Sequence, residues 1–90
     1  MSERKPEKTF RYKSGTDRNV SVAVWRNESN GRSWLAAGRP QLQYKEEEEW
    51  KESTSFSASD LFALQRCVTD AIAFIHFEEM KEKREHERAA

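Results

Sequence analysis

The spacing of apolar residues changes once along this chain of 90 residues, at Ser57. Before that point apolar and polar residues alternate in short runs, which is the two-residue period of half-buried β-strands. After it, apolar residues recur every three or four positions, which is the period of an amphipathic helix. We therefore expect an α+β domain in which a series of strands precedes one long C-terminal helix.

The clearest predicted strand covers residues 20–26, and its two faces differ in chemistry. The face expected to pack on the helix carries Val20, Val22 and Val24, and the opposite face carries Ser21, Ala23 and Trp25. Three further strands are predicted at 9–13, 33–44 and 50–56. Short connections favour antiparallel neighbours, so we expect a four-stranded antiparallel curved meander followed by the helix.

The connections between these strands are rich in turn residues. Gly15 is free to take a positive φ in the first turn, and Asn30-Gly31 is a strong hairpin signal. The acidic run 46–49 is expected to form a solvated turn. Within the third strand, residues 38–40 (Gly-Arg-Pro) predict a bulge or bend, because proline has no N–H to donate to a ladder.

The predicted helix begins with a capping signal, since Ser57 and Asp60 have the spacing of a capping box. Its expected apolar stripe consists of Leu61, Leu64, Val68, Ile72 and Ile75, widened by Cys67, Ala71 and Phe74, with Phe62 and Phe77 as further candidates. This is more apolar surface than one small sheet normally covers, and a chain of this size is marginal as a monomer. We expect a homodimer through the C-terminal helix. The alternative is that the stripe only covers its own sheet.

The length of the chain allows one domain, predicted at residues 9–90 and preceded by a disordered arm at 1–8. The C-terminal end of the helix is expected to fray. A single cysteine excludes an internal disulfide and favours a reducing compartment. No apolar run reaches the length of a membrane span, and the N-terminus does not resemble a signal peptide. We therefore expect a cytoplasmic protein without a membrane partner.

The residue types needed for catalysis are sparse. Cys67 falls in the apolar stripe, where a thiol is normally inert, and His76 and His86 have no third ligand nearby to complete a metal site. The run 46–49 lacks the alternating ligands and glycine turn of a calcium loop. We expect no enzymatic activity, no cofactor, no metal and no small-molecule substrate.

The net charge of zero conceals an uneven distribution. Residues 1–45 hold ten basic and four acidic side chains, whereas residues 46–90 hold six basic and twelve acidic ones. A basic, aromatic sheet backed by an acidic helix suggests a surface for single-stranded DNA or RNA, bound with little sequence preference. Stacking is assigned to Trp25 and Trp34. Phosphate contacts are assigned to Arg11, Lys13, Arg39, Lys45 and Lys51.

Two alternatives to this function remain open from the sequence. Each tryptophan taken singly is more typical of a partly buried packing residue beside a dimer contact. The sheet edge or the acidic helix is also suited to a protein-interaction module in which nucleic acid has no part.

Several short motifs between residues 20 and 61 resemble those of a family of small, uncharacterised bacterial proteins. These are Val22-Ala23-Val24-Trp25 with Asn27, then Asn30-Gly31, Tyr44-Lys45, Trp50-Lys51-Glu52-Ser53 with Phe56, and Asp60-Leu61. The order of strands and helix is also similar to that of Whirly and positive-cofactor-four type single-stranded DNA-binding domains. That resemblance implies dimers whose curved sheets hold the unpaired strand. This chain departs from the pattern in its zero net charge and in the interruption at 38–40.

Overall fold

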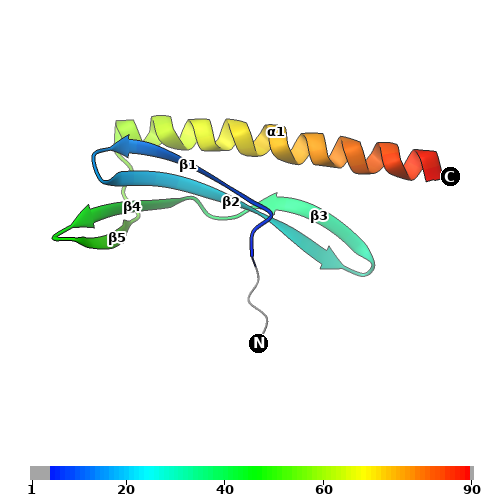
Figure 1. Cartoon of the computed structure of the whole chain (residues 1–90), viewed down its shortest axis with the longest axis horizontal. Coiled ribbons are helices and arrows are strands. Elements are labelled where there is room, and N and C mark those ends of the chain that lie inside the picture. The colour runs from blue at the N-terminus through cyan, green and yellow to red at the C-terminus, as the bar shows by residue number, and fades with distance from the viewer. Residues whose placement is uncertain (1–4, 90) are drawn as a thin grey trace.

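A computed structural model describes residues 5–89 and shows an α+β fold in which one long helix lies along one face of an open sheet (Figure 1). The elements in chain order are β1 (Lys8–Gly15), β2 (Arg18–Ser29), β3 (Arg32–Ala37), β4 (Gln41–Glu46), β5 (Glu49–Ser53) and α1 (Ala58–Ala89). All strand pairings are antiparallel. The predicted architecture, strands followed by one C-terminal helix, is confirmed.

The long strand β2 organises the sheet. β1 pairs with one of its edges, and β3 and β4 share the other edge. The predicted strand 33–44 is therefore two strands, which makes the strand count five rather than four. Val24 pairs with Ala37 and Ser21 pairs with Gln41. The two residues of β2 between these pairs, 22 and 23, therefore lie opposite three residues, 38–40. The expected bend at residues 38–40 is confirmed, with the N–H of Gly38 donating to the carbonyl of Ala23 at 2.8 Å.

Two of the hairpin turns have two residues, both with positive φ. Asn30 (φ 51°) and Gly31 (φ 77°) form the turn predicted between β2 and β3. Glu47 (φ 50°) and Glu48 (φ 67°) form the same kind of turn between β4 and β5. In the first turn the positive φ belongs to Asp17 (53°) and not to Gly15, because the side chains of aspartate and asparagine tolerate this region.

The ends of the strands differ from the expected bounds. Residues 1–4 of the predicted arm lie outside the described residues, whereas Lys8 already belongs to β1. The N–H of Glu7 donates to the carbonyl of Val24 at 2.8 Å, which extends the pairing by one residue. At the other end of the sheet, β5 stops at Ser53 and a turn leads to the helix.

The core lies between α1 and the valine face of β2, as predicted. Its buried members are Val20, Val22, Val24, Leu35, Leu42, Ala63, Cys67 and Ala71. The helix thus contributes mostly small side chains, which allow it to lie close to the sheet. The predicted stripe faces elsewhere: Leu64 and Ile75 are half-buried at the margin of the core, and Leu61, Val68 and Ile72 are exposed. The alternative that the whole stripe covers its own sheet is therefore wrong for these three residues.

A buried carboxylate fixes the start of the helix. Asp60 has no exposed surface and receives two hydrogen bonds from Arg18, at 2.8 Å from Nε and 2.7 Å from the terminal nitrogen. The N–H of Ser57 donates to Asp60 at 2.8 Å, and the N–H of Asp60 donates to the Ser57 hydroxyl at 3.3 Å. The predicted capping box is therefore confirmed. The Arg18 guanidinium holds the pKa of Asp60 well below its usual range.

Further side-chain contacts attach the rest of the helix to the sheet. The hydroxyl of Tyr12 on β1 donates to the carboxylate of Asp70, and this hydrogen bond raises the pKa of Tyr12. Arg26 on β2 donates to Glu82 at 2.8 Å and to Glu7 at 3.1 Å. The helix is thereby held to the sheet at three levels along its length.

Candidate nucleic-acid interface

The face of the sheet turned away from α1 is the candidate interface, and we call it the reverse face. It is made by the strand residues that alternate with the buried valines and by their cross-strand partners, because directly opposed residues point to the same side. Among the described residues, no helix or strand lies over this face (Figure 1). The indole and cationic groups that alternation places here are therefore turned away from the core.

Three of the predicted site residues meet at one hollow on the reverse face. Arg11 from β1, Trp25 from β2 and Arg39 from the bend line a depression of about 300 Å³. Ser21 and Ala23 form part of its floor. Two guanidinium groups beside an indole provide both elements of single-strand recognition, a flat apolar surface for a base and cations for phosphates.

Gly38 determines how Trp25 lies. A Cβ atom at this glycine would stand 3.1 Å from Nε1 of the indole, closer than an ordinary contact. Asn27 and Ala36 line a second depression of about 400 Å³ that Trp25 also borders. Trp25 is half-buried, so its ring is held in place by the bend and still borders both depressions.

Trp34 lies further along the same face, near the β2–β3 turn. It pairs with Asn27, which makes it a diagonal neighbour of Trp25 on the reverse face. Its side chain is 44% exposed. β3 is at an edge of the sheet, and the hollow beside Trp34 also receives Glu79 from the helix. Arg32 lines the same hollow, so one acid and one base lie beside Trp34, whereas Arg11 and Arg39 lie beside Trp25.

Lys13 and Lys45 are both exposed and lie on the reverse face, on β1 and β4 respectively. Lys45 pairs directly with Trp50, whose side chain is 52% exposed. Trp50 therefore belongs to the candidate interface, although it was not predicted from the sequence. In a hairpin with a two-residue turn at 47–48, residue 46 pairs with residue 49 and residue 45 with residue 50. The length of the turn would therefore have placed Trp50 beside Lys45.

Lys51 was assigned to the site and lies on the other face of the sheet. It pairs with Tyr44, whose side chain points toward Arg18 on the helix side. Its Nζ is 3.9 Å from a carboxylate oxygen of Glu46. The alternation along β5 explains the error, because adjacent residues of a strand point to opposite faces. The structure therefore separates Lys51 from the other predicted phosphate contacts.

The reverse face is poor in acids. Of the strand residues that register assigns to it, Glu52 alone carries a carboxylate, opposite Gln43. The cationic groups on the same side are Arg11, Lys13, Lys45, Arg39 at the bend and, opposite Ser29, Arg32 on β3. Five basic residues of the first half of the chain thus lie on the face that also carries the indoles, whereas Arg18 and Arg26 pair with acids of the helix.

Other chemistry-bearing groups have local structural roles. The Cys67 thiol is buried, lies 3.5 Å from the carbonyl oxygens of Phe10 and Val20, and has a pKa raised by burial. In the part of the chain that the structure describes, no three potential metal-ligating side chains of His, Cys, Asp or Glu come together. α1 is not long and apolar enough to cross a membrane.

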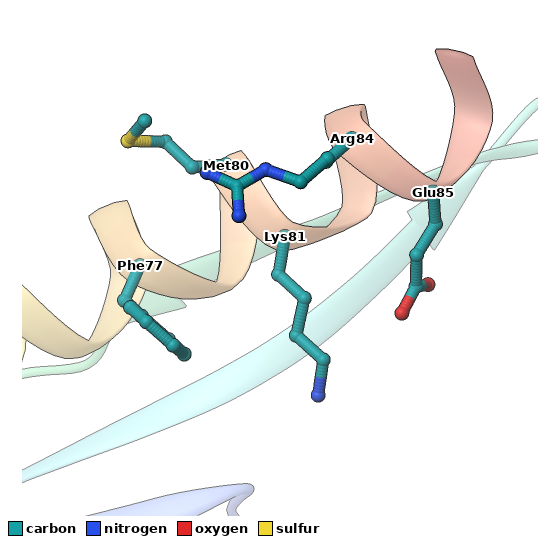
Figure 2. A pocket seen from close by; sticks show the side chains of 5 residues that line it. All are labelled: Phe77, Met80, Lys81, Arg84 and Glu85. Carbon is teal, nitrogen blue, oxygen red and sulfur yellow. The ribbon is translucent and has the colours of Figure 1, made fainter. Parts of the chain in front are cut away.

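A hollow of about 280 Å³ lies on the C-terminal third of α1 (Figure 2). Its walls are five side chains of this one helix, Phe77, Met80, Lys81, Arg84 and Glu85. In Figure 2, Arg84 reaches back toward Met80, while Phe77, Lys81 and Glu85 project to another side of the ribbon. Because long side chains of one helix form it, this hollow lacks the fixed walls of a ligand site.

Comparison with known proteins adds no relative to this description. No protein-family profile, no curated protein and no solved structure matches the chain. The function is therefore argued from the reverse face itself.

Proposed function

We propose that this protein binds single-stranded nucleic acid, DNA or RNA, on the reverse face of its sheet without strong sequence preference. The observation that carries the proposal is the hollow where Arg11, Trp25 and Arg39 meet. It combines a half-buried indole with two guanidinium groups on a face that no other described element covers.

The chemistry of the reverse face favours unpaired over paired strands. Base–aromatic stacking contributes about 1–3 kcal/mol per base and requires a base face that is not already stacked in a duplex. Three indoles, those of Trp25, Trp34 and Trp50, are distributed along this face. Every base has a π-face, so such stacking discriminates little between sequences.

The cations supply the second part of the affinity. Arg11, Lys13, Arg39 and Lys45 would neutralise phosphates of the bound strand and release its counterions. With about four such contacts, the logarithm of the association constant would fall with a slope of about −3 against the logarithm of salt concentration. Doubling the salt would then weaken binding by about sevenfold.

Fluorescence anisotropy with labelled 20-nucleotide oligo-dT and oligo-rU tests the proposal. We expect binding at low salt with the steep salt dependence given above, and weaker binding to a duplex of the same length. A flat anisotropy signal at tens of micromolar protein in low salt would exclude the function. Equal affinity for duplex and single strand would exclude the role assigned to the indoles.

A further inference from the structure

α1 carries a row of exposed apolar side chains that its own sheet does not use. Leu61, Val68 and Ile72 are 52%, 41% and 63% exposed. Their separations of seven and four residues place them within about 40° of one another around the helix. The row lies about 100° around the helix from the buried line of Asp60, Cys67 and Ala71. It therefore points sideways, past the edge of the core.

The surroundings of this row are uncharged. Leu64 and Ile75 border it on the side of the core, and Gln65, Thr69 and His76 border it on the outer side. We call these eight residues the uncharged flank: Leu61, Leu64, Gln65, Val68, Thr69, Ile72, Ile75 and His76. The chain as a whole is rich in charge, with 36% of its residues charged. This flank extends over four helical turns and contains no acid, lysine or arginine. Such a surface is typical of a protein contact.

The apolar residues of the uncharged flank have the same spacing in both directions from Val68. They follow one another at intervals of three, four, four and three residues. We propose that this flank binds the same flank of a second copy, with the two helices antiparallel and a two-fold axis at Val68. Leu61 would then face the partner's Ile75, and Leu64 the partner's Ile72, which is the reciprocal pairing of an isologous contact.

The ends of the uncharged flank agree with this arrangement. The next side chain on the same side after Ile75 is the exposed Glu79. Glu79 lines the hollow beside Trp34 of its own chain, so the uncharged flank ends where the helix meets the β2–β3 hairpin. Arg66 lies over the ring of Tyr12 at 4.6 Å, and Asp70 accepts from the Tyr12 hydroxyl, so both are directed toward β1 and away from the contact.

The length of the contact sets the expected strength of the dimer. Residues 61–75 span about 21 Å of helix. A contact of this length is at the small end of specific interfaces, where association is typically weak and reversible. We therefore expect a dissociation constant in the micromolar range. The reverse faces take no part in the contact, so each dimer would keep two of them open.

Sedimentation velocity of the full chain from about 1 to 500 μM, without nucleic acid, tests the contact. We expect a monomer–dimer equilibrium that Val68→Glu weakens at least tenfold, because two carboxylates would meet at the axis. Phe62→Glu is the matched control, since Phe62 is exposed at 69% on another side of the same helix. Circular dichroism should show both variants folded, because both positions are exposed.

Three outcomes would overturn the proposal. One is a monomer at every concentration, which would leave the flank to a different protein. Another is a dimer that Phe62→Glu disrupts and Val68→Glu does not. The third comes from cross-linking, because a residue at a two-fold axis meets its own copy. We expect Val68→Cys to form a disulfide-linked dimer under mild oxidation and Phe62→Cys to form much less; equal yields would exclude the axis at Val68.

Discussion

Asp60 shows how much of this fold depends on one side chain. It caps the helix, accepts two hydrogen bonds from Arg18 and has no exposed surface. Arg18 is the first residue of β2, so the pair joins the start of the helix to the start of the central strand. A charge buried in this way is stabilised only while its partner is present.

Replacement of Asp60 is expected to destabilise the protein strongly. Asp60→Ala removes the cap and leaves the Arg18 guanidinium without its carboxylate. Because Arg18 keeps some contact with solvent, we expect a loss of about 2–3 kcal/mol in the free energy of unfolding. Urea denaturation measures it, with Glu79→Ala, an exposed carboxylate on the same helix, as control. If the free energy of unfolding fell by less than about 0.5 kcal/mol, the Asp60–Arg18 pair would not be important for the stability of the fold.

The same carboxylate predicts the response of stability to acid. The pKa of Asp60 is lowered in the folded state, so the unfolded chain binds a proton at higher pH than the folded chain does. Its contribution is therefore complete at neutral pH, declines below about pH 4 and is lost as the pH falls through the folded value. Urea midpoints between pH 6 and pH 2 should fall more steeply for the native chain than for Asp60→Asn. If the urea midpoints of the two proteins fell equally with pH, Asp60 would not be the source of the acid sensitivity.

The cations of the reverse face can be tested one at a time. Arg11→Ala and Arg39→Ala should each weaken oligonucleotide binding about fivefold at low salt. Each should also reduce the salt slope by about 0.7, as expected for one lost phosphate contact. Lys51→Ala is the matched control, because this lysine lies on the helix side of the sheet. Equal effects of Lys51→Ala and Arg11→Ala in the anisotropy assay would contradict the proposed face.

Among the elements, the β4–β5 hairpin has an unfavourable turn. Glu47 and Glu48 both have positive φ, a conformation that suits asparagine and glycine. The double replacement Glu47→Asn with Glu48→Gly should stabilise the protein by about 1 kcal/mol and raise its melting temperature by about 4–8 °C. Glu47→Gln with Glu48→Gln removes the same two charges without relieving the backbone. If the control stabilises equally, charge repulsion and not conformation limits this turn.

The elements that could be predicted from the sequence are those with local signals. The valine alternation of β2, the Asn30-Gly31 turn, the bend at 38–40 and the Ser57–Asp60 cap all depend on residues close together in the chain. The face of the helix that meets the sheet could not be predicted in this way. Apolar residues occupy a wide arc of α1, so periodicity leaves open which part of the arc is buried.

Residues of the candidate site could be predicted wherever the register of their strand could be predicted. Arg11, Lys13, Trp25 and Trp34 follow from alternation along β1 to β3, whose turns were identified. The prediction included Lys51 and left out Trp50, because the turn at 47–48 was expected only as a solvated acidic run. A shift of one residue moves every side chain of a strand to the other face.

At the scale of the whole molecule, the charges of the chain are distributed unevenly between the two faces of the sheet. Arg11, Lys13, Arg39 and Lys45 share the reverse face with the indoles, whereas Glu78, Glu79 and Glu82 lie on the helix. A protein with zero net charge can thereby present a positive surface to a polyanion. The zero net charge that distinguished this chain from the resembling domains does not argue against the proposed function.

The bend at residues 38–40 has a mechanical consequence. β3 and β4 pair with different halves of β2, so the β2–β3 and β4–β5 hairpins are free to twist independently about the central strand. Trp34 belongs to one hairpin and Trp50 to the other. A strand long enough to stack on both rings would couple the two hairpins and stiffen the sheet. Slower amide hydrogen exchange in β3 and β5 with a long oligonucleotide, but not with a trinucleotide, would reveal that stiffening.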